Sequence, residues 1–269
     1  IGDVRNAGRL AMALRGVDLM VHAAAMKQVP VAEYNPLECI HTNVLGAENV
    51  AQASIEARVE RVLALSTDKA ANPVNLYGAS KLAADKIFVA ANHLSGSGGP
   101  RFSIVRYGNV LGSRGSVIPY FRRLVAQGAR ELPITDPRMT RFWITLEQGA
   151  AFVASCMASM EGSEIFVPKI PSMRIVDLAG VVAPGVPHKI VGVRPGEKLH
   201  EVMITADDAR STRDLRDRYV IWPAIVLWPG TERTRSGTPV PEDFRYASET
   251  NDRWLTADAL LSLIQAAEP

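Results

Sequence analysis

The chain has 269 residues, of which 47% are hydrophobic and 22% are charged, and its formal net charge is +2. This length and composition are typical of a soluble globular protein with one large domain, alone or with a smaller lobe. The small net charge argues against a nucleic-acid partner, and no apolar run reaches the length of about 18 residues that a membrane span needs.

Strand and helix patterns alternate along the chain, and the apolar runs among them are typical of buried parallel strands. These runs cover residues 18–25, 61–66, 102–107 and 164–168. Helical patterns lie between them, over residues 36–57, 76–94 and 116–128. The alternation predicts an α/β fold built on a doubly wound parallel sheet.

The ends of these helices carry recognisable signals. The helix at 36–57 begins with Asn35 and Pro36, a cap followed by a proline in the first turn. Its predicted apolar face holds side chains spaced by three or four residues: Leu37, Ile40, Val44, Ala47 and Val50. The helix at 116–128 ends on Gly128, which tolerates the left-handed conformation common at helix ends.

The regular alternation ends near residue 129, after which the pattern becomes irregular and richer in proline. We therefore expect residues 1–128 to form the sheet domain. Residues 129–269 are expected to form mainly a smaller C-terminal lobe.

The cysteines and histidines suggest no metal chemistry. Cys39 and Cys156 are far apart and lack metal-binding spacing, which is typical of buried thiols in a reducing compartment. The five histidines are scattered. His22 lies inside an apolar run, where packing is the better interpretation. We expect a cytoplasmic protein without a metal site.

The stretch 63–86 places Tyr77 and Lys81 one helical turn apart, so their side chains share a face. Tyrosine ordinarily has a pKa of about 10, and a nearby ammonium favours the phenolate, which can then take a proton from a hydroxyl group. By itself the spacing also fits two solvated residues on a surface helix. Its place after a predicted parallel strand, where open α/β sheets bind ligands, favours the catalytic interpretation.

Several segments accompany this stretch: residues 2–6, 22–50, 65–81, 106–121, 132–145 and 194–201. Together they resemble the extended short-chain dehydrogenases/reductases, and more narrowly the inverting UDP-N-acetylglucosamine 4,6-dehydratases of pseudaminic acid biosynthesis. Related dehydratases of other sugar pathways keep the S-T-D-K run but carry methionine in place of Tyr77. The resemblance implies a cytoplasmic, homo-oligomeric lyase that uses NADP and acts on UDP-N-acetylglucosamine.

The resemblance also implies an order of steps. Tyr77, assisted by Lys81 and Thr67, deprotonates the carbon-4 hydroxyl while hydride leaves for the nicotinamide. Lys69 then removes the carbon-5 proton, and Asp68 protonates the departing carbon-6 hydroxyl. Hydride returns to carbon 6, and carbon 5 is reprotonated from the opposite face. These roles need a partly neutral lysine and a protonated aspartic acid. A surface ion pair in a turn is the alternative interpretation of residues 68 and 69.

Further contacts are implied by the same resemblance. Cofactor contacts fall on Asp3, Val4, Ala23, Lys27, Leu65, Ser66, Tyr77, Lys81, Val110, Leu111, Gly112, Ser113 and Arg114. Substrate contacts fall on Lys27, Asn109, Val117, Thr135, Arg194 and Glu197. The guanidinium of Arg194 suits a diphosphate geometrically, and Lys27 fits a solvated loop lysine equally well.

The sequence departs from the family pattern at its start. A dinucleotide site needs a G-x-G-x-x-G turn after its first strand, and the run at 108–116 has the wrong spacing. We therefore expect an N-terminally truncated, Rossmann-like domain whose first strands are missing. Two alternatives stay open at this point: a UDP-sugar 4-epimerase, and an inactive truncated paralogue that acts only as a binding protein.

Overall fold

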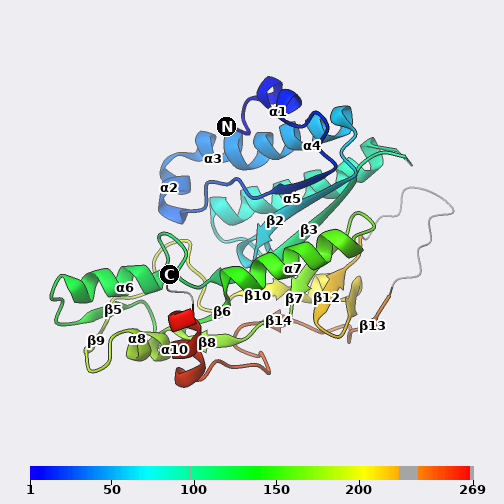
Figure 1. Ribbon diagram of the computed structural model, residues 1–269. Coiled ribbons are helices and arrows are strands. Elements are labelled where there is room, and N and C mark those ends of the chain that lie inside the picture. Colours follow the sequence, from blue (N-terminus) through cyan, green and yellow to red (C-terminus); the bar gives the residue numbers. More distant parts are fainter. Residues whose placement is uncertain (97, 224–235, 267–269) are drawn as a thin grey trace. The chain divides into compact units, whose positions relative to one another are not determined.

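The computed structural model describes residues 1–96, 98–223 and 236–266 (Figure 1). The chain divides into two compact units. Unit 1 comprises Ile1–Arg106, Phe152–Lys169 and Met203–Arg245, and unit 2 comprises Tyr107–Ala151, Ile170–Val202 and Tyr246–Pro269. This division differs from the one expected at residue 128, because strands from later segments join the N-terminal sheet.

Unit 1 is built on a sheet with the strand order β1-β2-β3-β7-β12-β11-β13. The four predicted strands are confirmed as neighbours: β1 (Leu19–His22), β2 (Arg61–Thr67), β3 (Arg101–Tyr107) and β7 (Ile165–Pro168). The pairs β1–β2 and β3–β7 are parallel, as predicted. Antiparallel strands extend the sheet beyond β7: β12 (Arg218–Ile221), β11 (Thr212–Asp214) and β13 (Thr238–Pro239).

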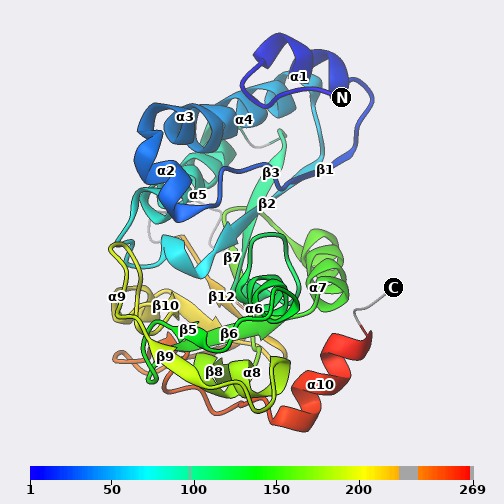
Figure 2. The ribbon, with the colours of Figure 1, turned by 90° about the vertical axis from the view of Figure 1, so that its left-hand side faces the viewer.

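The predicted helix at 76–94 is confirmed as α5, and further helices lie before β1 and between the later strands. Their bounds are α1 Ala7–Ala13, α2 Val29–Tyr34, α3 Pro36–Ile40, α4 Gly46–Ala57, α5 Leu76–Leu94, α7 Leu146–Ser159 and α9 Ala206–Ala209. The predicted helix at 36–57 is interrupted by a π-helical segment, η1 (His41–Leu45). A short 3₁₀ turn, η2 (Asp68–Ala70), follows β2. In two views of the molecule, α4 and α5 lie side by side (Figures 1 and 2).

The predicted apolar face of the helix at 36–57 is wrong in its first part, because the π-helical segment changes the direction of the side chains. Ala47 and Val50 are buried as expected, whereas Leu37 is 67% exposed and Ile40 is 36% exposed. A π-turn bonds residues five apart rather than four, so it rotates the side chains before it out of line with those after it. Sequence periodicity assumes an uninterrupted helix and does not detect this shift.

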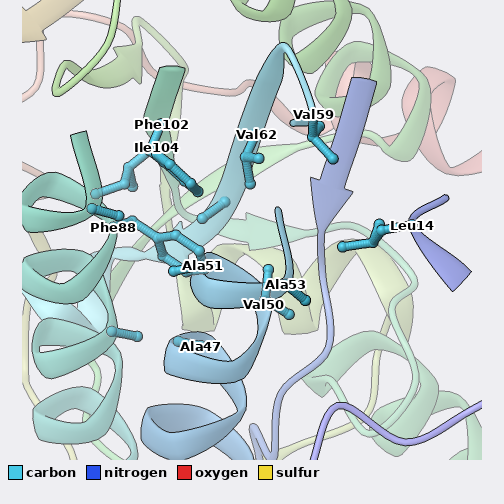
Figure 3. Packing of buried hydrophobic residues seen from close by; sticks show 13 residues of the cluster. Leu14, Ala47, Val50, Ala51, Ala53, Val59, Val62, Phe88, Phe102 and Ile104 are labelled. Atoms are coloured by element: carbon cyan, nitrogen blue, oxygen red, sulfur yellow. The ribbon is translucent and has the colours of Figure 1, made fainter. Parts of the chain in front are cut away.

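The core of unit 1 lies between α4, α5 and the parallel strands (Figure 3). Helix α4 contributes small side chains, including Ala47, Ala51 and Ala53, on the side of the core where it packs against α5. Phe88 of α5 stacks on Phe102 of β3, with ring centroids 6.3 Å apart. Each fully buried phenylalanine stabilises the fold by about 1.5–3 kcal/mol, so this cluster fixes α5 on the sheet.

Unit 2 holds a three-stranded sheet in the order β4-β6-β8 and a two-stranded parallel sheet of β5 and β9. The strand bounds are β4 Asn109–Val110, β5 Leu132–Ile134, β6 Thr140–Ile144, β8 Ser172–Arg174 and β9 His188–Ile190. The helices are α6 Val117–Ala126, α8 Ile175–Val182 and α10 Ala257–Ala266. Its apolar core includes the buried Trp143, Phe121 and Leu178. The remaining strands, β10 (Val202–Ile204) and β14 (Tyr246–Ala247), stand where the chain passes from one unit to the other.

In the described ranges, no helix combines the length and apolar character needed to cross a lipid bilayer.

The histidine in β1 belongs to the core, as its place in an apolar run predicted. His22 is 2% exposed, and its ring centroid lies 5.4 Å from that of Phe88. Burial lowers the pKa of His22 to about 4, and the positive charge of Lys81 adds to this effect. The folded protein therefore holds His22 neutral at a pH where an unfolded chain binds a proton.

We predict that His22 makes the fold acid-sensitive. Its pKa is about 4 in the fold against 6.5 when solvated, so its contribution is complete above pH 6.5 and is lost as the pH falls towards 4. The loss is at most about 3 kcal/mol of unfolding free energy. Urea unfolding at several pH values should show a shallower acid loss for His22→Asn than for the wild type.

The exposed His188 in β9 provides the control, because His188→Asn removes a histidine from the surface. Equal pH slopes for the wild type and His22→Asn would contradict the prediction.

Candidate active site

The turn after β2 carries the run Thr67-Asp68-Lys69. Thr67 caps the 3₁₀ turn η2, and its Oγ1 accepts a hydrogen bond of 3.3 Å from the Lys69 amide. The same hydroxyl donates to Asp68 Oδ1 over 2.9 Å. Thr67 thus sets the turn geometry and orients the carboxyl group at the carboxyl end of a parallel strand.

The ion pair of Asp68 and Lys69 joins a buried carboxyl group to a half-buried lysine, so it is not a surface pair. Asp68 is 0% exposed, the Lys69 side chain is 25% exposed, and Lys69 Nζ donates to Asp68 Oδ1 over 3.0 Å. A buried carboxyl group with an adjacent amine can exchange a proton with it at little electrostatic cost. Oδ1 accepts from both neighbours, so an acidic proton on this carboxyl group belongs on Oδ2.

Tyr77 and Lys81 lie on the first turns of α5, with the tyrosine 8% and the lysine 4% exposed. The interpretation as two solvated surface residues is therefore wrong. Lys81 Nζ donates to the Leu65 carbonyl over 2.7 Å, which joins α5 to β2. Burial lowers the pKa of Lys81, and the charge of Asp85 opposes this effect.

Gly78 brings the two pairs together. It follows Tyr77, and its amide donates to the N-cap residue Asn75 over 2.8 Å. A Cβ atom at Gly78 would lie 2.3 Å from the Lys69 carbonyl oxygen, a distance that no side chain tolerates. Only glycine therefore lets η2 rest directly on the first turn of α5.

Asn43 is a site residue that the sequence reasoning missed. It lies in the π-helical segment, and its Oδ1 accepts from the Met26 amide over 2.7 Å. Its Nδ2 donates to the Met26 carbonyl over 3.0 Å and to Ser80 Oγ over 2.9 Å, and Ser80 Oγ donates to the Tyr77 carbonyl. Asn43 thereby joins the loop after β1 to the Tyr77 turn. In the sequence, the sign of such a role was a polar residue between the apolar positions 40 and 47. Its place in a π-helical segment also fits, because such segments are frequent at functional sites.

The residues expected along the cofactor lie near the ends of β1 and β2. Ala23 and Lys27 are exposed in the segment after β1. Asp3 is exposed and pairs with Arg5 over 2.7 Å, and hydrogen bonds from Arg5 lower the pKa of Asp3 to about 2. The Ser66 hydroxyl donates to Asp85. Any cofactor contact of Ser66 would therefore be made by its backbone.

The remaining expected residues belong to unit 2. Asn109 pairs with Trp143 in the β4–β6 ladder, and the loop to α6 includes Gly112, whose φ of 70° favours glycine. Val117 begins α6, and Thr135 follows β5. The expected site is therefore divided: the Thr67–Lys81 cluster lies in unit 1, and Asn109–Val117, Thr135, Arg194 and Glu197 lie in unit 2.

Arg194 and Glu197 occupy the two ends of the R-P-G-E turn. The Glu197 amide donates to the Arg194 carbonyl over 3.1 Å, and Gly196 has a φ of 76°, as a turn with proline before glycine requires. The Glu197 carboxylate accepts a hydrogen bond from the Arg194 guanidinium, and this contact raises the pKa of Arg194. A ligand anion at Arg194 would compete with Glu197.

Arg141 of β6 holds the segment after this turn. The sequence analysis did not identify this arginine. It is 7% exposed, and it donates to the Leu199 and Lys198 carbonyls over 3.1 and 2.9 Å. Its guanidinium lies 3.6 Å from the Glu201 carboxylate. A buried arginine thus fixes the base of the Arg194 turn.

Among the described residues, no group of three or more His, Cys, Asp and Glu side chains is placed to hold a metal ion.

Comparisons with known proteins agree on one family. The profile described as "Polysaccharide biosynthesis protein" matches residues 1–223. Over its whole length the chain is 55% identical to a Campylobacter jejuni protein named "UDP-N-acetylglucosamine 4,6-dehydratase (inverting)", of which it covers 82%. It is 44% identical to a Rickettsia canadensis protein named "UDP-glucose 4-epimerase", with 82% of this chain and 66% of that protein covered.

Solved structures show the same fold. Pen from Bacillus thuringiensis has a TM-score of 0.88 and 33% identity, with 100% of this chain and 80% of that chain covered. DesIV from Streptomyces venezuelae, a dTDP-glucose 4,6-dehydratase with NAD and TYD bound, has a TM-score of 0.68 and 27% identity, with 74% and 68% covered. These likenesses confirm the predicted α/β fold class.

We predict that Gly78→Ala lowers the unfolding free energy by about 1–3 kcal/mol, because overpacking forces backbone to move. The new methyl group would meet the Lys69 carbonyl, so η2 must leave α5. Denaturant unfolding measures the change.

Gly180→Ala in α8 is the matched control, since nothing lies within 4 Å of its Cβ position. Alanine there should stabilise the helix by up to about 1 kcal/mol. If both variants are equally stable, the close approach at Gly78 is not a constraint.

Proposed function

Since the chain belongs to the family of polysaccharide biosynthesis proteins, we propose that it converts UDP-N-acetylglucosamine to a UDP-2-acetamido-2,6-dideoxy-hexos-4-ulose with inversion at carbon 5. The family assignment confirms the resemblance predicted from the sequence. One observation carries the proposal: the pair of buried Asp68 and half-buried Lys69 lies in η2, which packs directly against the turn of α5 that holds Tyr77. Such a pair suits the elimination of water from a sugar.

The first step is a deprotonation. Tyr77 Oη takes the proton of the carbon-4 hydroxyl, and the Lys81 ammonium, one turn further along α5, favours the phenolate that this requires. Lys81 is held in place by the Leu65 carbonyl. Ser80, within the same turns, fixes the Tyr77 backbone.

The segment after β1 fits a nicotinamide dinucleotide. Ala23, Ala24 and Ala25 are exposed and carry small side chains at the carboxyl end of a parallel strand, the edge where such sheets bind ligands. When bound there, the cofactor supplies hydride chemistry, with carbon 4 as donor and carbon 6 as acceptor. We propose NADP rather than NAD, on the resemblance alone.

The elimination falls to the second pair. Once carbon 4 is a ketone, Lys69 Nζ takes the proton of carbon 5, and Asp68 Oδ2 gives a proton to the departing carbon-6 hydroxyl, which leaves as water. Asp68 is then a carboxylate and Lys69 an ammonium, and this ion pair is the arrangement with Nζ 3.0 Å from Oδ1. Proton transfer from Lys69 to Asp68 then returns this pair to its neutral form. The proton that carbon 5 regains when hydride returns to carbon 6 offsets the proton that Tyr77 took from the carbon-4 hydroxyl.

An epimerase is the alternative that the Rickettsia relative raises. An epimerase oxidises and reduces carbon 4 and eliminates no water, so it has no use for a buried acid and base beside Tyr77. The burial of Asp68 at 0% exposure therefore favours the dehydratase. A binding protein without catalysis has no use for either pair.

Substrate binding is assigned to residues of unit 2. We propose that Arg194 binds the diphosphate of the substrate, because its planar guanidinium matches phosphate oxygens. Its side chain is 69% exposed and meets only one carboxylate in the described contacts. Asn109, Val117 and Thr135 are proposed to contact the sugar nucleotide, and Glu197 to contact the ribose once Arg194 has turned to the phosphates.

We also propose that the protein works as a homo-oligomer in the cytoplasm. Large apolar side chains are exposed along α2, α3 and η1, including Tyr34 at 87% and Leu37 at 67%. Contiguous exposed apolar surface of this kind marks interfaces. The cysteines Cys39 and Cys156 are buried and reduced, which agrees with a reducing compartment.

We predict that Lys69→Ala in the full-length protein separates oxidation from elimination. Tyr77 and Lys81 still allow oxidation of carbon 4, but turnover falls by about 10²–10⁴-fold without a base for carbon 5. Reduced nicotinamide absorbance should then build up after UDP-N-acetylglucosamine is added. Tyr77→Phe should block the first step and show no such absorbance.

Lys86→Ala, at an exposed position of α5, is the matched control and should turn over normally. A wild-type protein that forms the 4-epimer and no dehydrated keto sugar would favour the epimerase. Normal turnover by Lys69→Ala would remove this residue from the mechanism.

We predict that Arg194→Ala mainly raises KM, since the diphosphate does not react and its binding energy is shared by ground and transition states. Steady-state kinetics with UDP-N-acetylglucosamine measure the effect. Arg174→Ala is the control. Like Arg194, Arg174 is exposed and forms an ion pair with the acidic residue three positions later, which is Asp177. An unchanged KM for Arg194→Ala would exclude the guanidinium from the site.

A further inference from the structure

A network of buried charged side chains lies next to the Tyr77–Lys81 pair along α5. It takes no part in the proposed reaction steps. Asp85 is one helical turn beyond Lys81 on α5, and it is 2% exposed. Its Oδ2 accepts from Ser66 Oγ over 2.9 Å and from Arg106 Nη2 over 3.4 Å. Two donors that converge on one oxygen require an acceptor there, as an ionised carboxylate provides.

The network joins three elements of unit 1. Ser66 is on β2 and directly follows Leu65, whose carbonyl accepts from Lys81. Arg106 is on β3 and 3% exposed, and its Nη1 donates to the Met203 carbonyl over 2.9 Å. The same Nη1 lies 3.7 Å from Asp208 Oδ2. Consecutive residues of β2 thus hold Lys81 and Asp85 in a fixed relation.

We propose that Asp85, anchored by Ser66 and Arg106, is a positioning residue that keeps Lys81 in its charged form beside Tyr77. An isolated ammonium buried in the fold would lose its proton, since desolvation disfavours the charged form. A neutral Lys81 could no longer favour the Tyr77 phenolate. The inference rests on the proposed function for its kinetic consequence only.

The charges around Lys81 support this assignment. Burial lowers the pKa of Lys81, and the charge of Asp85 offsets part of that fall. His22, facing from β1, is neutral because its own pKa is lowered by burial. Burial raises the pKa of Asp85, while Arg106, Lys81 and the Ser66 hydroxyl lower it. With Arg106 held partly by Asp208, Asp85 is the carboxylate that balances the lysine.

The test is Asp85→Asn in the full-length protein, which keeps the shape and removes the charge. The acid limb of the pH–kcat profile reports the loss of the Tyr77 proton. In this variant the limb should move to higher pH by about one pH unit or more. Activity at pH 7 should fall by about tenfold and recover at higher pH. A loss of packing alone would lower activity at all pH values and leave the limb in place, which would overturn the proposal.

Two further variants sharpen the result. Asp85→Glu keeps the charge and should restore the limb towards its wild-type position. Asp207→Asn removes an exposed carboxylate of α9 and should leave the limb unchanged. If Asp85→Asn does not fold, Ser66→Ala should move the limb in the same direction by a smaller amount, and an unmoved limb there would overturn the proposal.

A second readout does not depend on turnover. The ¹⁵Nζ signal of Lys81, assigned by its absence in Lys81→Arg, should titrate at lower pH in Asp85→Asn than in the wild type. If the wild type fails to convert UDP-N-acetylglucosamine, the proposed function fails while this titration still decides the network. Identical titration curves would overturn the network itself.

Discussion

The hydrogen bond from the buried Lys81 ammonium to the Leu65 carbonyl is the constraint on which the site depends. It joins the first turns of α5 to the end of β2, and so fixes Tyr77 relative to the Thr67-Asp68-Lys69 turn. A buried lysine must be compensated, and the fold provides both a carbonyl acceptor and the Asp85 carboxylate. Glycine at position 78 completes the arrangement, because any larger residue would separate the two segments.

This constraint explains how one fold supports a reaction with two acid–base stages. In the proposed mechanism the Tyr77 pair acts on an alcohol, and the Asp68 pair acts on a carbon acid and a leaving group. The two pairs come from adjacent elements, β2 with its turn and α5, so a single packing contact positions them both. The 3.0 Å hydrogen bond between Lys69 and Asp68 would let this pair exchange a proton in that mechanism.

The substrate residues depend on a second, separate anchor. In unit 2 the R-P-G-E turn presents Arg194 and Glu197, and its downstream backbone is held by the buried Arg141. Arginine suits this role because its fork of donors satisfies two carbonyls at once. The ion pair with Glu197 raises the pKa of Arg194, and an anion bound at this guanidinium would have to compete with Glu197.

The sequence by itself determined the parallel strands, the helix at 76–94 and the pairing of Tyr77 with Lys81, because apolar runs, caps and helical spacing are local properties of the chain. It also indicated the family, through motifs of contiguous residues. Only the tertiary structure decided that Asp68 is buried, that Asn43 and Arg141 hold the backbone of the candidate site, and that a π-helical segment turns Leu37 and Ile40 outward. These features depend on contacts between distant segments, such as Ser66 with Asp85, and no local pattern records which distant side chain fills a given space.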